Sequence, residues 1–303
     1  MTIEIKAASG YADLERWVET RNEVAPDDPD DPAMMALVRA SELGHVNLLA
    51  LDDGEVVGTG LLAADPNSLE SSHPYVEVMV PARYRGRGVG TALLRELSDK
   101  ARGLSKEGLH LEARADDTYS LAYLERRGFV EFGRLPKLVL ELADHEVPEP
   151  ATTDGFEITW LADRHDLVAS AHAVAAQTYP ELEGSIAKQA VTLHEWQVYE
   201  LGDPRLAFEL TALAVVAGEV IGYATLLRFD GGSLGEHRMT TVLPAWRRRG
   251  VGTALTQAQV AAAKQASVET LQVWARSDAH QLLFEKLGFR AKTASIDFRG
   301  PLQ

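Results

Sequence analysis

A repeat with a period of roughly 160 residues constrains the fold of this chain more than any other feature of its sequence. Three segments of the first half recur in the same order in the second half. The pairs are Gly54–Gly58 with Gly218–Gly222, Arg87–Leu93 with Arg249–Leu255, and Glu125–Phe129 with Glu285–Phe289. A period this long matches a compact domain and far exceeds a solenoid unit. The sequence therefore predicts two copies of one fold.

The hydrophobic pattern predicts the same order of elements in both halves. In the first half we expect a strand over 2–7, helices over 11–24 and 33–43, a hairpin over 47–63, a strand over 75–80, a helix over 88–101, a strand over 109–113, a helix over 118–127 and one or two strands in 129–142. In the second half we expect a strand over 156–161, helices within 166–201, a hairpin over 210–228, strands over 238–243, 270–275 and 290–298, and helices over 250–266 and 279–287.

These elements predict two α/β domains, over 1–145 and 155–303, each with a mixed sheet and flanking helices. The segment 146–154 contains Pro148 and Pro150 among polar residues and is typical of a linker.

Composition excludes several classes of function. The chain has no cysteine, so disulfides, thiolate metal sites and thiol nucleophiles are absent, and we expect no metal. No apolar run approaches the ~18 residues of a membrane span, and residues 1–10 lack the pattern of a signal peptide. We therefore expect no membrane partner and a cytoplasmic location. The formal charge of −15 argues against nucleic acid as a partner and is compatible with a small cationic substrate, although acidic surfaces commonly serve solubility alone.

Each copy of the heptapeptide Arg-Gly-Val-Gly-Thr-Ala-Leu lies between a predicted strand and a predicted helix. The N-terminus of a helix offers free N–H groups and about half a positive charge, which suits a phosphate. Arginines cluster at both loops, namely Arg83, Arg85, Arg87, Arg247, Arg248 and Arg249. Neither copy has the Gly-Lys-Ser/Thr of a nucleoside-triphosphatase loop or the G-x-G-x-x-G spacing of a dinucleotide fingerprint. Both copies share Arg-x-x-Gly-x-Gly, with Arg85, Gly88 and Gly90 in the first.

This pattern resembles the acetyl-coenzyme A (acetyl-CoA) signature of the GNAT N-acetyltransferase superfamily, Arg/Gln-x-x-Gly-x-Gly/Ala. The preceding hairpin and the following helix that ends in Gly-Phe agree with it, so the resemblance covers two tandem domains. It implies a mostly antiparallel, twisted sheet with a splayed central strand, acetyl-CoA as cofactor and a small-molecule amine as substrate. The cofactor-binding residues that it implies are Met79, Val80, Arg85, Gly86, Arg87, Gly88, Val89, Gly90, Thr91, Thr241, Val242, Arg247, Arg248, Arg249, Gly250, Val251, Gly252 and Thr253.

The resemblance also implies direct acetyl transfer to the amine, assisted by a carboxylate base on the central strand. Six residues before Val242 lies Glu236, with His237 beside it, whereas the same count from Val80 reaches Pro74. We therefore favour the C-terminal domain as catalytic. Because the two loops differ by one residue between proline and arginine, Glu77 is a second candidate base, with the N-terminal domain as the active half.

The tyrosine that commonly serves the family as general acid is missing from both halves. Leu124 and Phe284 occupy its expected positions, and Tyr123 lies one residue earlier. This departure keeps a non-enzymatic acyl-CoA-binding module open as an alternative.

The acidic segment 26–32 lies between the first two predicted helices, where family members line the acceptor site. Its carboxylates would attract a cationic amine, or they form a solvated loop. The chain is expected to be a monomer or a homodimer.

Overall fold

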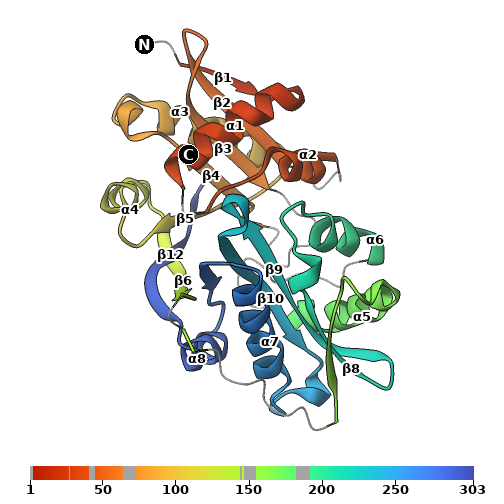
Figure 1. The fold of residues 1–303 in the computed structure, drawn as a ribbon. Coiled ribbons are helices and arrows are strands. Elements are labelled where there is room, and N and C mark those ends of the chain that lie inside the picture. Colours follow the sequence, from red (N-terminus) through yellow and green to blue (C-terminus); the bar gives the residue numbers. More distant parts are fainter. Residues whose placement is uncertain are drawn as a thin grey trace. The chain divides into compact units, whose positions relative to one another are not determined.

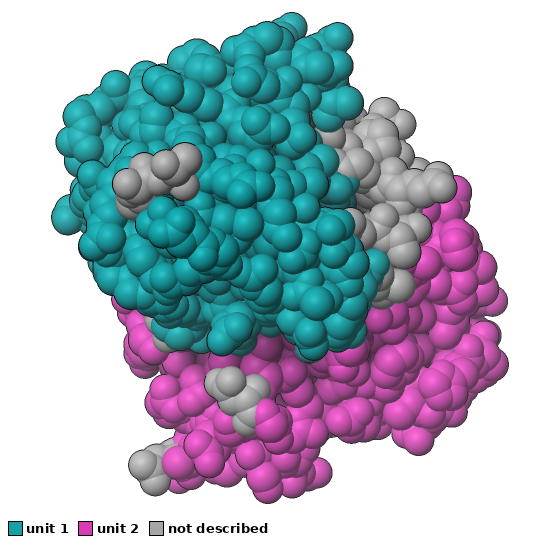
Figure 2. All heavy atoms as spheres, turned by 90° about the horizontal axis from the view of Figure 1, so that it is seen from above, with its two compact units in different colours: residues 1–134, 295–303 teal, residues 135–294 magenta. Residues whose placement is uncertain are grey.

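The computed structural model describes residues 3–26, 28–40, 45–63, 72–143, 145–146, 155–181 and 192–303. It divides into two compact units (Figure 2). Unit 1 contains Met1–Arg134 and Ser295–Gln303, and unit 2 contains Leu135–Ala294. None of the helices in the described residues is long and apolar enough to cross a membrane.

Unit 1 is built on a mixed sheet in which β4 and β5 are parallel and the other paired strands are antiparallel (Figure 1). Its strands, in spatial order, are β1 (Glu4–Ala7), β2 (His45–Asp52), β3 (Glu55–Ala63), β4 (Tyr75–Met79), β5 (Gly108–Arg114) and β12 (Arg290–Pro301). Its helices are α1 (Gly10–Val24), α2 (Pro32–Ala40), α3 (Val89–Gly103) and α4 (Thr118–Glu125).

Unit 2 repeats this plan with β10 and β11 as the parallel pair. Its strands, in spatial order, are β7 (Glu157–Trp160), β8 (Ala212–Val216), β9 (Glu219–Phe229), β10 (Leu234–Val242), β11 (Thr270–Trp274) and β6 (Val130–Glu141). Its helices are α5 (Val168–Thr178), α6 (Leu193–Trp196), α7 (Val251–Gln265) and α8 (Asp278–Lys286). The predicted fold class, a mixed, mostly antiparallel sheet with flanking helices used twice, is confirmed.

Each unit receives most of its last strand from the other half of the sequence: residues 295–301 of β12 belong to unit 1, and residues 135–141 of β6 belong to unit 2. In unit 1, β12 pairs antiparallel with β5, so that Asp297 lies opposite Glu112. In unit 2, β6 pairs antiparallel with β11, so that Lys137 lies opposite Trp274. Unit 1 is therefore discontinuous in sequence, whereas unit 2 is a single segment. The repeat domains 1–145 and 155–303 stay a prediction about the duplication.

The two faces of the unit 1 sheet carry different side chains. Leu109 and Leu111 of β5 lie in the core that includes the apolar face of α3, where Leu93, Leu94 and Leu97 are buried as the helical spacing predicts. Tyr75 of β4 packs on the opposite face, with the core formed by Leu14 and Trp17 of α1. Since side chains alternate along a strand, Glu77 shares this second face with Tyr75, and His110 and Glu112 share it on β5.

Candidate active site

The two glycine loops have the same backbone geometry in both units. Gly88 and Gly250 are the residues that precede α3 and α7, with φ angles of 88° and 82°. Neither helix has a side-chain cap, and the first N–H groups bonded back to these glycines are those of Ala92 and Ala254. The preceding N–H groups of the first turn remain available to a ligand. Both loops therefore present uncapped amides at the positive end of a helix.

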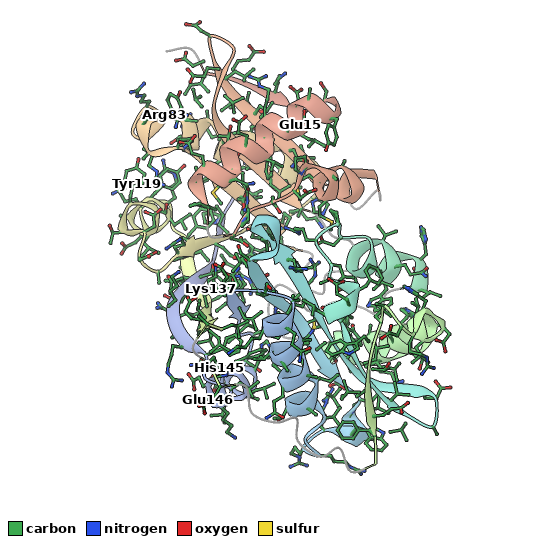
Figure 3. All side chains as sticks on the ribbon, in the orientation of Figure 1. Glu15, Arg83, Tyr119, Lys137, His145 and Glu146 are labelled. Atoms are coloured by element: carbon green, nitrogen blue, oxygen red, sulfur yellow. The ribbon has the colours of Figure 1, made fainter. Side chains whose placement is uncertain are left out.

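The signature arginines fix the loops to the central strands. Arg85 Nε donates to the carbonyl of Val80 at 3.1 Å, and Arg247 Nε donates to that of Val242 at 3.0 Å. The spacing from strand to arginine is therefore identical in the two units. In unit 1 the Arg85 guanidinium also lies 3.6 Å from Asp117 and over the ring of Tyr119, which is labelled in Figure 3.

None of the described residues requires glycine at the second signature position. A Cβ added at Gly90 would meet the Tyr123 hydroxyl at 3.6 Å, and one at Gly252 would meet Val242 at 3.9 Å, both ordinary contacts. Glycine also weakens a helix relative to alanine. The missing side chain thus leaves room for a ligand against the first helical turn, and a pyrophosphate held by main-chain amides fits this cradle.

The central strands separate from their parallel neighbours close to these loops. The ladder between β4 and β5 contains the pair Tyr75 with His110, and the ladder between β10 and β11 ends at His237. Beyond these points Met79 of β4 pairs with β3, and Thr241 of β10 pairs with β9. This is the splayed strand that the sequence predicts, and it could receive an extended chain beside Met79 and Thr241.

The strand registers show which residues of the two units correspond. Met79 and Thr241 occupy matching positions, as do Glu77 and Met239. The register of β10 then shifts between His237 and Met239, around Arg238. Because β4 has no such shift, Tyr75 rather than Pro74 corresponds to Glu236.

Glu77 lies in a buried cluster of charges. Its carboxylate is 3.5 Å from the guanidinium of Arg21, which also pairs with Asp28 at 3.0 Å and Asp30 at 3.3 Å. Oε1 of Glu77 is buried and accepts no hydrogen bond from the described residues. Burial raises the pKa of Glu77 to about 7, against the opposing effect of Arg21. A carboxylate with this pKa suits a general base near neutral pH.

The acidic segment therefore turns partly inward. Asp28 and Asp30 bind Arg21, and Asp31 accepts hydrogen bonds from the N–H groups of Ala33 and Met34, as expected of a helix cap. Asp27 lies outside the described residues.

The candidates in unit 2 have different surroundings. Glu236 accepts a hydrogen bond of 2.7 Å from the side-chain amide of Gln272. His237 is buried against Phe284 and Phe289, and its Nδ1 lies 2.8 Å from the side-chain oxygen of Gln259. Burial lowers the pKa of His237 to about 4. These surroundings are those of a core histidine and do not favour His237 as a base.

Comparison with known proteins agrees with this geometry. Residues 11–129 match the model of the acetyltransferase (GNAT) family, and residues 209–291 match that of a GNAT acetyltransferase domain. The chain is 27% identical over 266 residues to a mycothiol acetyltransferase from Amycolatopsis mediterranei, covering 84% of each chain. It is 32% identical over 123 residues to the N-alpha-acetyltransferase RimI of Mycobacterium tuberculosis, covering 40% of this chain and 75% of the relative.

The chain belongs to the GNAT acetyltransferase family. Among solved structures, a tandem GNAT protein from the clavulanic acid biosynthesis pathway matches with a TM-score of 0.76 at 18% identity, covering 100% of this chain and 99% of the other. A GCN5-related N-acetyltransferase from Sphaerobacter thermophilus matches with a TM-score of 0.70 at 19% identity, covering 99% and 96%. The tandem GNAT architecture predicted from the repeat is confirmed, and the chain is an N-acetyltransferase rather than a binding module alone.

Within this GNAT acetyltransferase, the residues at the expected position of the general acid are buried. Leu124 is 4% exposed and Phe284 is fully buried, so both serve the core. Tyr123 directs its hydroxyl to the start of α3, where it approaches the space beside Gly90. This hydroxyl is buried, and burial raises its pKa against the opposing effects of Thr91 and Arg127. Leu283 holds the matching position in unit 2.

Sequence reasoning did not connect Arg21, His110 and Asp297 with Glu77, and it rated His110 below His237 as a base. Arg21 has no signature spacing to Glu77, from which 56 residues separate it. His110 and Asp297 are 187 residues apart and meet only because β12 joins the sheet of unit 1. The alternation in β5 alone could have placed His110 and Glu112 on one face.

Proposed function

We propose that unit 1 is the catalytic half and transfers the acetyl group of acetyl-CoA to the amine of a small molecule, with Glu77 as general base. The observation that carries this proposal is the buried Glu77 carboxylate, whose Oε1 has no hydrogen-bond partner among the described residues and whose pKa is about 7. At the matching position unit 2 has Met239, which cannot accept a proton. The C-terminal domain with Glu236, favoured from the sequence, is the rival hypothesis.

The loop residues suit the binding of acetyl-CoA. The amides that follow Gly88 would hold the pyrophosphate, and the free edge of β4 beside Met79 and Val80 would pair with the pantetheine arm. When bound, acetyl-CoA supplies an activated thioester that an amine can attack directly. Unit 2 would hold a second cofactor through Gly250 and Gly252 or would serve as a structural partner.

The charges around Glu77 favour an acceptor that arrives as a cation. Glu77, Asp28 and Asp30 surround the single guanidinium of Arg21, so the carboxylates outnumber it. An ammonium group beside Glu77 would reduce this imbalance. Glu77 would then remove a proton from the attacking nitrogen, and Tyr123, whose hydroxyl lies beside Gly90, would supply a proton to the leaving thiolate.

A matched pair of variants tests the assignment. Thiol release from acetyl-CoA is measured across a panel of small amines for Glu77→Gln and Glu236→Gln. Loss of the base in Glu77→Gln should lower kcat by about 10²–10⁴, the usual contribution of a general base, whereas Glu236→Gln should stay close to the unmodified protein. A large loss of kcat in Glu236→Gln alone would assign catalysis to unit 2. Equal losses of kcat in both variants would mean that neither carboxylate has a specific role.

A further inference from the structure

A buried histidine–aspartate pair lies where β4 and β5 separate in unit 1. His110 Nε2 is 2.8 Å from Asp297 Oδ1, and the two residues are 2% and 4% exposed. His110 is the register partner of Tyr75, the residue of β4 that directly precedes the splayed part of the strand. The pair therefore lies beside the proposed acetyl-transfer site, although Asp297 comes from the last strand of the chain.

The surroundings of His110 fix both its ring and its tautomer. Tyr75 and Phe132 make edge contacts with the imidazole, with ring centroids 5.4 and 5.2 Å away. An ionised carboxylate only accepts hydrogen bonds, so the contact with Asp297 places the proton of a neutral imidazole on Nε2. The Nδ1 lone pair is then the basic site, and no described residue forms a hydrogen bond with it.

The charged groups around His110 couple it to the rest of the site. Glu112 lies on the same strand, with a carboxylate oxygen within 4.8 Å of the other two groups. From β12, Arg299 stacks over Phe132 at 4.0 Å. Burial is the main cause of the raised pKa values of Tyr75 and Glu77, and the charge of Glu112 adds to both shifts. Thus Tyr75, Glu112 and Asp297 lie close to the imidazole, Arg299 lies opposite His110 in the register of β5 and β12, and Glu77 follows Tyr75 two residues along β4.

Acetylation of an ammonium ion removes two protons from one nitrogen. One proton must leave before the lone pair can attack, and a second must leave as the N–C bond forms and the C–S bond breaks. Building on the proposed function of unit 1, we propose that His110, oriented by Asp297, accepts the first proton and that Glu77 accepts the second. The thiolate takes one proton, and the other is released to solvent, so one proton is released per turnover.

In these terms His110 is a catalytic residue and Asp297 a positioning residue. Unit 2 offers a natural contrast, because Gln272 and Lys137 hold the matching positions. Neither the amide nor an ammonium group reproduces a carboxylate-oriented imidazole. The substitution His110→Gln therefore introduces into unit 1 the residue type that the repeat already accepts at this position.

The test compares His110→Gln and Asp297→Asn with the unmodified protein between pH 6.5 and 10, using the amine that is acetylated fastest. Without His110 the site must capture amine that is already neutral, and the neutral fraction falls about tenfold for each pH unit below the pKa of the amine. We expect kcat/KM of His110→Gln to be reduced by about 100-fold at pH 7, within the usual range for proton-transfer catalysis, and the deficit to disappear near the pKa of the amine. Asp297→Asn should show the same trend with a smaller deficit, and Asp297→Glu should restore part of the activity.

A merely structural role predicts a deficit that is constant with pH, and that outcome would overturn the proposal. A loss of activity when a chelator is added to the unmodified protein would also overturn the proposal, because His110, Glu112 and Asp297 would then act as metal ligands. Melting curves of both variants establish that they fold, and Asp297→Asn preserves the shape of the site if His110→Gln does not fold. Failure of the proposed function has a different signature: the unmodified protein would acetylate no amine, or Glu77→Gln would retain full activity.

Discussion

The two units keep the same backbone for the cofactor and carry different side chains for the chemistry. Gly88 and Gly250 adopt the same conformation, and Arg85 and Arg247 make the same hydrogen bond. On the polar face of the sheet the matched residues differ at every compared position. The pairs are Tyr75 with Glu236, Glu77 with Met239, His110 with Gln272 and Asp297 with Lys137. On the helices α4 and α8, Tyr123 is likewise matched by a different residue, Leu283.

This difference shows how a duplicated domain can diverge. A cradle made of main-chain amides depends on a few glycines, so it persists while neighbouring side chains change. Proton transfer depends on individual side chains, and one substitution such as methionine in place of glutamate removes it. Conserved loops in both units therefore indicate two possible cofactor sites, whereas the side chains favour one catalytic centre.

The largest effect that we expect on the use of acetyl-CoA distinguishes the glycine loop of unit 1 from that of unit 2. Gly90→Val places a branched side chain where the phosphates would approach the first turn of α3, and a displacement of about 1 Å in an active site can cost 100-fold. We expect kcat/KM for acetyl-CoA to fall by at least about that factor, while Gly252→Val changes it less than twofold. Steady-state kinetics and melting temperatures check this, since a Cβ fits at both positions. A greater loss in Gly252→Val would move the active cofactor site to unit 2.

The pH dependence of turnover distinguishes the carboxylates. Because Glu77 must be ionised to accept a proton and its pKa is raised to about 7, kcat should fall about tenfold for each pH unit below that value. The measurement uses saturating amine and acetyl-CoA, so that the pH profile reports the ionisation of the bound enzyme and not changes in substrate binding. Glu236→Gln should retain the same acidic limb, whereas Glu77→Gln should be slow and lack it. An acidic limb that survives in Glu77→Gln belongs to another group and contradicts the assignment.

Much of the fold could be predicted from the sequence because it follows local patterns. For α3, the spacing of apolar residues predicts the helix and its buried face, and the glycine before it predicts where the helix begins after β4. The exchange of β6 and β12 could not be predicted, because the final strands of both halves have similar alternating patterns. Either strand can supply backbone hydrogen bonds to β5 or β11, so only the three-dimensional structure shows which pairing is made.

The candidate site was predicted less completely for a related reason. Counting residues back from the loop assumes an unbroken strand, but the register shift around Arg238 displaces everything before it by one position. This shift made Pro74 the apparent counterpart of Glu236, although Tyr75 is the structural one. The pKa of Glu77 depends on burial and on Arg21, which are properties of the folded chain and not of a motif.

The two units should respond to pH in opposite directions. The folded state raises the pKa of Glu77 from 4.5 to about 7, so its contribution to stability is lost as pH rises through this window. The folded state lowers the pKa of His237 from 6.5 to about 4, so stability is lost as pH falls through that window. Each shift corresponds to at most about 3 kcal/mol.

Urea denaturation between pH 4 and 8 measures both effects. Glu77→Gln should raise the free energy of unfolding at pH 8, and the gain should vanish near pH 4.5. His237→Gln, which keeps a polar partner for Gln259, should remove part of the loss of stability below pH 6.5. Parallel stability curves for either variant and the unmodified protein would show that the altered group does not titrate as inferred.

The smallest expected effect compares the caps of α4 and α8. Asp117 accepts a hydrogen bond from the N–H of Ser120, and Ser277 accepts one from that of His280, so either alanine substitution should cost about 1 kcal/mol of stability. Asp117 also lies 3.6 Å from Arg85, a residue that anchors the unit 1 loop. We therefore expect Asp117→Ala to raise KM for acetyl-CoA severalfold, and Ser277→Ala to change stability alone. Equal kinetics for the two variants would mean that Arg85 is held sufficiently by Val80, and the contact with Asp117 would then have no part in shaping the loop.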